Sequence, residues 1–203
     1  MQLGWPLVLA AAVALTATIP QAHAFPPIGS PTTVHPGLLN ALGGDSKAIF
    51  AYANAGDTSA LVMTGFPGNI FNNSVNAAGD TVDLGVLSGP QQFGLDNMST
   101  GTNFLANVAD AAGDYHAFYT TNFADFAVGA LPAATAAAIA AAGGTVTFVG
   151  WEDLTGAQGS DFDYNDLIFA FTNLTPTAVP EPATLALIGV GLAGLGLVRR
   201  RKA

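Results

Sequence analysis

Two apolar runs and the acidic stretch between them, TVTFVGWEDLTGAQGSDFDYNDLIFAFT (residues 145–172), decide the fold that the sequence predicts. The runs at 145–149 and 167–172 are rich in β-branched and aromatic side chains, which are enriched in β-strands. Gly, Asp and Asn fill the stretch between them, and these residues are typical of loops. The sequence therefore predicts a strand, a long acidic loop and a second strand.

Similar short runs, each bounded by turn residues, occur upstream. Residues 47–52 and 61–63 flank the turn-rich tetrapeptide Asn54-Ala55-Gly56-Asp57, and this arrangement predicts a β-hairpin. Further strands are predicted at 81–87, 91–95 and 115–120. Roughly seven short strands favour a mainly β fold, an antiparallel β-sandwich or jelly roll, over alternating β and α units.

Residues 130–142 break the β pattern with nine alanines. High helix propensity, Pro132 near the first turn and Gly143 at the end predict one short Ala-rich helix that lies against the sandwich. Prolines mark residues 25–44 as an extended lead-in and residues 175–182 as a linker. The β-sandwich domain is therefore expected at 45–174.

The charge distribution excludes one large class of function. Between Phe25 and Val179 there are thirteen acidic residues and a single base, Lys47, which give a formal charge of −12. Nucleic-acid binding needs Lys and Arg to displace counterions from phosphates, so no nucleic-acid partner is expected. The chain also has no cysteine, so its stability must come from a packed core or from a bound ion.

The first 24 residues have the features of an export signal. An uncharged, mostly apolar stretch at 7–16 precedes Ala22-His23-Ala24, the small-x-small pattern that signal peptidase cleaves. We therefore expect cleavage after Ala24, with Ala22 and Ala24 as the cleavage-site residues. The alternative is a buried apolar helix, but the run is too short to cross a bilayer about 30 Å thick.

The last residues of the chain form a three-part pattern. Pro180, Glu181 and Pro182 are followed by an uncharged run at 183–198 and a basic tail at 199–203. As a helix the run would be about 24 Å long, close to the thickness of a bilayer core, which predicts a transmembrane helix. The basic tail is expected to stay cytoplasmic, so the preceding domain lies outside.

This pattern resembles the PEP-CTERM sorting signal of Gram-negative bacterial surface proteins. The resemblance implies recognition near Pro180, Glu181 and Pro182 by a membrane-embedded exosortase, removal of the tail and delivery to the cell surface or extracellular matrix. It also implies an association with exopolysaccharide. The hydrophobic helix would then act as an address, as in a GPI signal. The alternative is an uncut membrane anchor.

The acidic loop is the candidate metal site. Calcium takes six to eight oxygen ligands, and alternate loop residues can direct their side chains to one side. Without a cation, each close pair of carboxylates would repel by about 1 kcal/mol even in water. We therefore predict a Ca²⁺ site among six residues, Glu152, Asp153, Asp161, Asp163, Asn165 and Asp166. The alternative is that these side chains are solvated turn residues.

The loop is not an EF-hand, because Asp166 occupies the position of the required Gly and Thr172 that of the required Glu. Residues 152–154 and 161–166, with their flanking strands, instead resemble the Glu-Asp-Leu…Asp-x-Asp-x-Asn-Asp signature of a β-rich domain of unknown function found in bacterial surface proteins. The resemblance implies a calcium-stabilised sandwich and no particular activity.

Few residues are suited to catalysis. Cysteine is absent, no Gly-x-Ser-x-Gly motif occurs, and Glu152 with Asp163 is the best pair for glycoside hydrolysis. We therefore expect an exported, non-catalytic surface or matrix protein. The alternative is a carbohydrate-binding module that contacts exopolysaccharide through the aromatic residues Tyr115, Tyr119 and Phe162. Trp151, Phe162 and Tyr164 are more simply explained as core residues.

Overall fold

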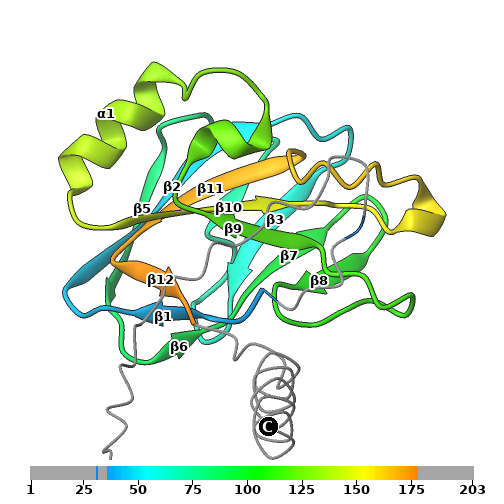
Figure 1. Cartoon of the computed structure of the whole chain (residues 1–203), viewed down its shortest axis with the longest axis horizontal. Helices are drawn as coiled ribbons and strands as arrows, with labels where there is room; N and C mark the ends of the chain where they lie inside the picture. The colour runs from blue at the N-terminus through cyan, green and yellow to red at the C-terminus, as the bar shows by residue number, and fades with distance from the viewer. Residues whose placement is uncertain (1–30, 32–35, 178–203) are drawn as a thin grey trace, which may run out of the picture.

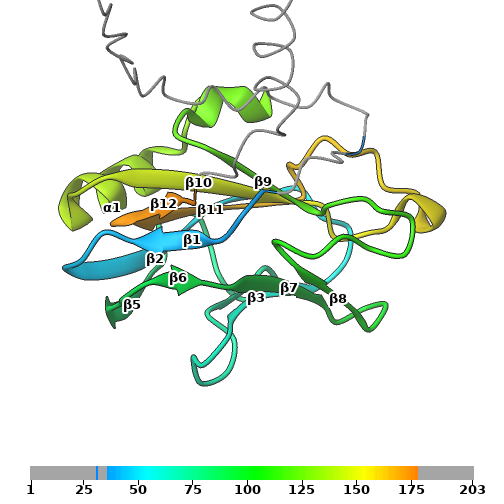
Figure 2. The ribbon, with the colours of Figure 1, turned by 60° about the horizontal axis from the view of Figure 1, so that its bottom comes forward.

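The computed structural model describes residue 31 and residues 36–177, and these residues form two main layers of antiparallel strands (Figure 2). The predicted mainly β fold with one helix is confirmed (Figure 1). The first layer is a five-stranded sheet in the order β5 (Thr81–Val86), β2 (Asp45–Ala53), β11 (Leu167–Thr172), β10 (Val146–Trp151) and β9 (Ala117–Thr120).

The second layer is a four-stranded sheet, and a small third sheet lies at one end of the sandwich. The four-stranded sheet has the order β4 (Phe71–Asn72), β3 (Ser59–Met63), β7 (Phe93–Asn97) and β8 (Thr102–Leu105). The third sheet has the order β12 (Leu174–Pro176), β1 (Leu39–Ala41) and β6 (Pro90–Gln91). This small sheet joins the two ends of the described domain.

The central strand β11 explains why its sequence is apolar without interruption. Leu167, Phe169 and Phe171 belong to the core between the two main sheets, whereas Ile168 and Ala170 belong to a second core on the outer face. A strand buried on both faces needs apolar side chains at every position. The outer core is covered by the helix, by a short 3₁₀ helix at Phe123–Phe126 and by part of the acidic loop.

The predicted Ala-rich helix is α1 (Ala133–Ala142), which follows Pro132 and ends at Gly143. It lies over β2 on the outer side of the five-stranded sheet (Figures 1 and 2). Thr135 is its one fully buried side chain, and the hydroxyl donates to the carbonyl oxygens of Phe50 and Ala51 at 3.4 and 3.3 Å. The helix thus covers the sheet with small side chains and one polar anchor.

Two details differ from the expectations. The predicted hairpin is wrong, because β2 pairs in the five-stranded sheet and β3 in the four-stranded sheet, so residues 54–58 connect the two layers. Strand pairing also extends beyond 45–174, since β1 lies in the expected lead-in and β12 continues into the expected linker. Both additions arise because Leu39 and Leu174 are fully buried in the core.

Several predicted segments lie outside the described residues. They are the signal peptide with Ala22 and Ala24, the sorting residues Pro180, Glu181 and Pro182, the transmembrane helix at 183–198 and the basic tail. Among residues 31 and 36–177, no helix has the length and apolar character needed to cross a bilayer.

Candidate metal site

The acidic loop, residues 152–166, connects the end of β10 to the start of β11. A hydrogen bond from the Asp153 N–H to Asp166 Oδ2 (3.0 Å) joins its two ends. Within it, a 3₁₀ turn at Gly156–Gln158 carries a capping box between Thr155 and Gln158. The loop therefore has internal structure and a closed base.

Glu152, the first residue of the loop, has no exposed surface. Its carboxylate accepts hydrogen bonds from the Ser160 hydroxyl, the Phe162 N–H (3.2 Å) and the Tyr164 N–H. The Glu152 N–H itself donates to the carbonyl oxygen of His116 at 2.9 Å. Residues 160–164 thus wrap around a buried carboxylate.

The backbone of the wrapped segment adopts an uncommon conformation. Phe162 and Tyr164 have φ values of 53° and 57°, in the left-handed region that aromatic residues rarely occupy. Both side chains are buried in the outer core, and the Tyr164 hydroxyl donates to the Tyr115 carbonyl oxygen at 3.0 Å. Burial of the two rings therefore holds both N–H groups toward Glu152.

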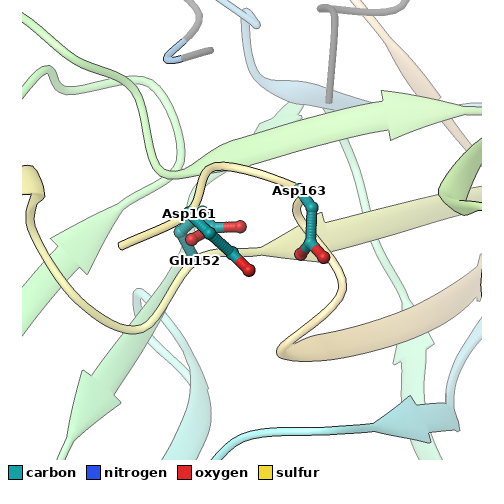
Figure 3. Close-up of side chains that lie close together, drawn as sticks. All are labelled: Glu152, Asp161 and Asp163. Carbon is teal, nitrogen blue, oxygen red and sulfur yellow. The ribbon is translucent and has the colours of Figure 1, made fainter. Parts of the chain in front are cut away.

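Three carboxyl groups meet where the loop turns back on itself. Ligand atoms of Glu152, Asp161 and Asp163 all lie within 4.8 Å of one another, and Figure 3 shows the side chains gathered in one place. Asp161 is exposed and Asp163 is half-buried. Asp161 and Asp163 alternate in sequence with Phe162 and Tyr164, whose buried rings pack into the outer core.

The structure brings only part of the predicted metal set together. Asn165 is next to this group, because its amide donates to Asp163 Oδ2 and its N–H donates to Asp163 Oδ1 at 3.1 Å. Asp153 and Asp166 instead lie at the base of the loop. The Asp153 carboxylate accepts a hydrogen bond from the Ser59 hydroxyl on β3 at 3.1 Å. The backbone carbonyl oxygen of Asp153 accepts one from the Asn97 side-chain amide on β7 at 2.7 Å.

The two-residue period of a strand explains why Glu152 and Asp153 lie in different parts of the loop. Trp151 points into the core between the sheets and is fully buried there, as the sequence indicated. The next residue, Glu152, therefore faces the outer core, and Asp153 faces the four-stranded sheet. Sequence reasoning missed the polar partners Ser59 and Asn97, because only tertiary packing brings them to the loop.

The pKa values of these acids reflect burial and mutual repulsion. Burial, against the opposing effect of hydrogen bonds from Ser160 and Tyr164 and with the added repulsion of Asp163 and Asp161, raises the pKa of Glu152 to about 7. The pKa of Asp163 is also raised, mainly by burial. Burial likewise raises the pKa values of Asp153 and Asp166 at the base of the loop. The acidic loop thus holds more negative charge than its buried surroundings favour.

No cationic side chain neutralises this charge within residues 36–177. Lys47, the one Lys or Arg between 25 and 179, is 3.1 Å from Asp83 on β5. His116 is fully buried, and its Nε2 lies 3.2 Å from Asp110 Oδ2. Burial lowers the pKa of His116, despite the opposing effect of Asp110.

The aromatic residues singled out for sugar stacking are largely covered. Tyr119 and Phe162 are 3% and 7% exposed, and Tyr115 is half-buried. Sugar stacking needs an accessible ring face, so neither Tyr119 nor Phe162 can provide one in this structure. The expectation that Phe162, Tyr164 and Trp151 are core residues is confirmed.

Comparison with known proteins bears on the C-terminal segment. Residues 178–202 match the family model of the PEP-CTERM protein-sorting motif. The chain carries a PEP-CTERM sorting signal. It is therefore an exported protein whose membrane-anchored precursor is recognised by an exosortase-type enzyme and sorted to the surface. Comparisons with curated proteins and with solved structures gave no match for the chain.

Proposed function

We propose that the mature chain is a non-catalytic protein of the cell surface or extracellular matrix whose β-sandwich is stabilised by calcium. The observation that carries this proposal is the meeting of Glu152, Asp161 and Asp163, with a fully buried carboxylate at the centre. Their ligand atoms are close enough to share one ion, because calcium–oxygen distances of about 2.4 Å place opposite ligands about 4.8 Å apart.

The donor set also suits calcium chemically. Carboxylate oxygens are ligands that calcium prefers, and Asn165 beside Asp163 can supply an amide oxygen. The half-buried and exposed positions of Asp163 and Asp161 leave room for water to complete six to eight ligands. A bound calcium ion would supply positive charge at a corner where the described residues supply none.

The burial of Glu152 supports the absence of catalysis. A general acid or base must reach the substrate, yet this carboxylate has no exposed surface and accepts hydrogen bonds on both oxygens. The pair Glu152 and Asp163 therefore suits an internal ion better than a glycosidic bond. Hydrolysis of bacterial exopolysaccharide by the purified protein would contradict this part of the proposal.

Calcium binding is tested by isothermal titration calorimetry of the purified domain at pH 7.5. We expect one site with a dissociation constant of about 0.1–1 mM, the range of extracellular calcium modules. Replacement of both Asp161 and Asp163 with Asn should abolish the heat of binding. Replacement of Asp45 and Asp83, two exposed acids on β2 and β5, with Asn serves as the control and should leave binding intact. Binding that survives the loop substitutions would contradict the site.

The calcium-free protein should lose stability as the pH rises from about 6.5 to 8. The raised pKa of Glu152, about 7, means that the folded state binds more protons than the unfolded state, so ionisation favours unfolding. Asp153, Asp163 and Asp166 shift in the same direction. The lowered pKa of His116 does not add to this loss, because protonation of His116 destabilises the folded state only as the pH falls.

Urea unfolding in calcium-free buffer at several pH values measures this dependence. Excess calcium should reduce this loss of stability with rising pH, because the ion stabilises the ionised carboxylates. Stability that rises between pH 6.5 and 8 without calcium would contradict the assignment of the buried acids.

We further propose that the sorting tail is cut from the mature protein rather than kept as an anchor. The intact mass of the surface-released protein should then be lower by about 2 kDa at the C-terminus, as for other tails that serve as an address. A released protein that still ends at Ala203 would contradict cleavage.

A further inference from the structure

Hydrogen bonds hold Thr177, the last described residue, in the folded domain. The Thr177 N–H donates to the Leu38 carbonyl oxygen at 2.7 Å, and the Leu38 N–H donates to Thr177 Oγ1 at 3.0 Å. The Thr147 hydroxyl donates to the carbonyl oxygen of the buried Leu174 at 2.8 Å. The motif match begins at residue 178. No long spacer therefore separates the folded domain from the sorting signal.

This spacing limits how far the sorting enzyme can be from the domain. Pro180 is three residues beyond Thr177, and an extended chain covers at most about 3.4 Å per residue, or roughly 10 Å. The first residue of the apolar run, Ala183, is six residues away, or roughly 20 Å. An enzyme that binds Pro180, Glu181 and Pro182 must therefore come close to the small sheet to which Thr177 is hydrogen-bonded.

That sheet, β12–β1–β6, presents an uncharged outer face. Leu39 and Leu174 point into the core, whereas Asn40 has Thr175 and Pro90 as its cross-strand neighbours on the outer side. Residues 36–44, 87–92 and 173–177 contain no Asp, Glu, Lys or Arg, although the domain as a whole is strongly acidic. Leu42, which directly follows β1, is 53% exposed.

We propose that this neutral face, formed by Asn40, Leu42, Pro90 and Thr175, docks against the exosortase-type enzyme while the tail is processed. The inference rests on the proposed processing. The short spacer forces the face and the enzyme together, and the centres of protein interfaces are depleted of charged residues. Placing an unpaired carboxylate there would cost desolvation free energy, so docking favours an uncharged surface.

The test compares two matched substitutions in cells that contain the enzyme. Leu42→Glu places a carboxylate on the docking face, and Val75→Glu places one on an equally apolar, 79% exposed position. Val75 lies two residues after Asn73, whose N–H donates to the Ser59 carbonyl oxygen at 3.2 Å. Ser59 pairs with Asn97 at the end of β7, whereas β6 precedes the other end of β7, at Phe93. We expect tail removal to slow about tenfold for Leu42→Glu and to stay unchanged for Val75→Glu.

Three further measurements distinguish loss of docking from loss of folding and from contact with the bilayer. Melting temperatures of the purified variants should match the parent, and a ten-residue Gly/Ser insertion after Thr177 should restore processing of Leu42→Glu, because a longer spacer removes the need for docking. A photo-crosslinking residue at position 40 should capture the sorting enzyme, identified by mass. Capture of lipid alone would assign the face to the bilayer and overturn the proposal.

The outcomes distinguish this inference from the proposal on which it rests. Equal processing rates for Leu42→Glu and Val75→Glu would overturn the docking face and leave tail removal intact. A parent chain that keeps its tail in the same cells would contradict tail removal itself, and with it the docking face.

Discussion

Replacement of Gly150 with alanine is expected to lower the free energy of unfolding by about 3 kcal/mol or more. Gly150 lies in β10, where an added Cβ would be 2.2 Å from the Phe126 ring and 2.2 Å from the Tyr164 carbonyl oxygen. Cβ atoms essentially never approach other atoms closer than 3.0 Å. The ring and the loop backbone would both have to move.

The same substitution should weaken the acidic loop, because Tyr164 donates its N–H to Glu152 and anchors the segment that carries Asp163. Urea unfolding measures the loss of stability, and calcium titration measures the effect on the site. Gly56→Ala is the matched control, since an added Cβ there meets no atom within 4 Å, and it should change stability by less than about 0.5 kcal/mol. Equal stabilities for the two variants would refute the packing described for β10.

Truncation of Glu152 to alanine is the second change with a large expected effect. It leaves the Ser160 hydroxyl and the Tyr164 N–H without their acceptor, whereas the Phe162 N–H keeps only its second acceptor, Ser160 Oγ, at 3.2 Å. Each unsatisfied buried donor costs about 1–3 kcal/mol, so we expect a loss of about 3 kcal/mol or more.

Glu152→Gln provides a second variant in case the truncated protein does not fold. It keeps the shape and one acceptor oxygen but removes the charge, so it should fold and lose its response to calcium. Asp83→Ala, which removes an exposed partner of Lys47, should keep both stability and calcium response close to the parent. A Glu152→Gln variant that calcium stabilises as strongly as the parent would exclude Glu152 as a ligand.

The sequence predicted the parts of the fold that depend on local pattern. The strands around 145–149 and 167–172 were predicted because their apolar runs are bounded by loop residues, and the helix because alanines lie between Pro132 and Gly143. The hairpin prediction failed because Leu61 and Phe50 meet in one core from two sheets, and no local signal distinguishes such a connection from a tight turn. The short strands β4 and β8 were missed, because two- and four-residue strands have little periodicity.

The candidate site was predicted in composition but not in arrangement. The sequence shows that Asp161 and Asp163 alternate with aromatic residues, and this spacing predicted both acids on one side of the loop. It does not indicate whether Glu152 or Asp153 faces them, because that depends on which face of β10 covers the core. Nor does it indicate the left-handed backbone of Phe162 and Tyr164, which tertiary packing imposes on residues that otherwise avoid it.

Thermal unfolding with and without calcium tests the central claim most directly. In 10 mM calcium, a site with a dissociation constant of about 0.1–1 mM should add about 1.4–2.7 kcal/mol of stability. For a domain of this size, the melting temperature should rise by about 3–10 °C relative to the same protein in EGTA. The Asp161→Asn, Asp163→Asn double variant should show no rise. A parent protein with the same melting temperature in calcium and in EGTA would contradict the proposal that calcium stabilises the loop at Glu152, Asp161 and Asp163.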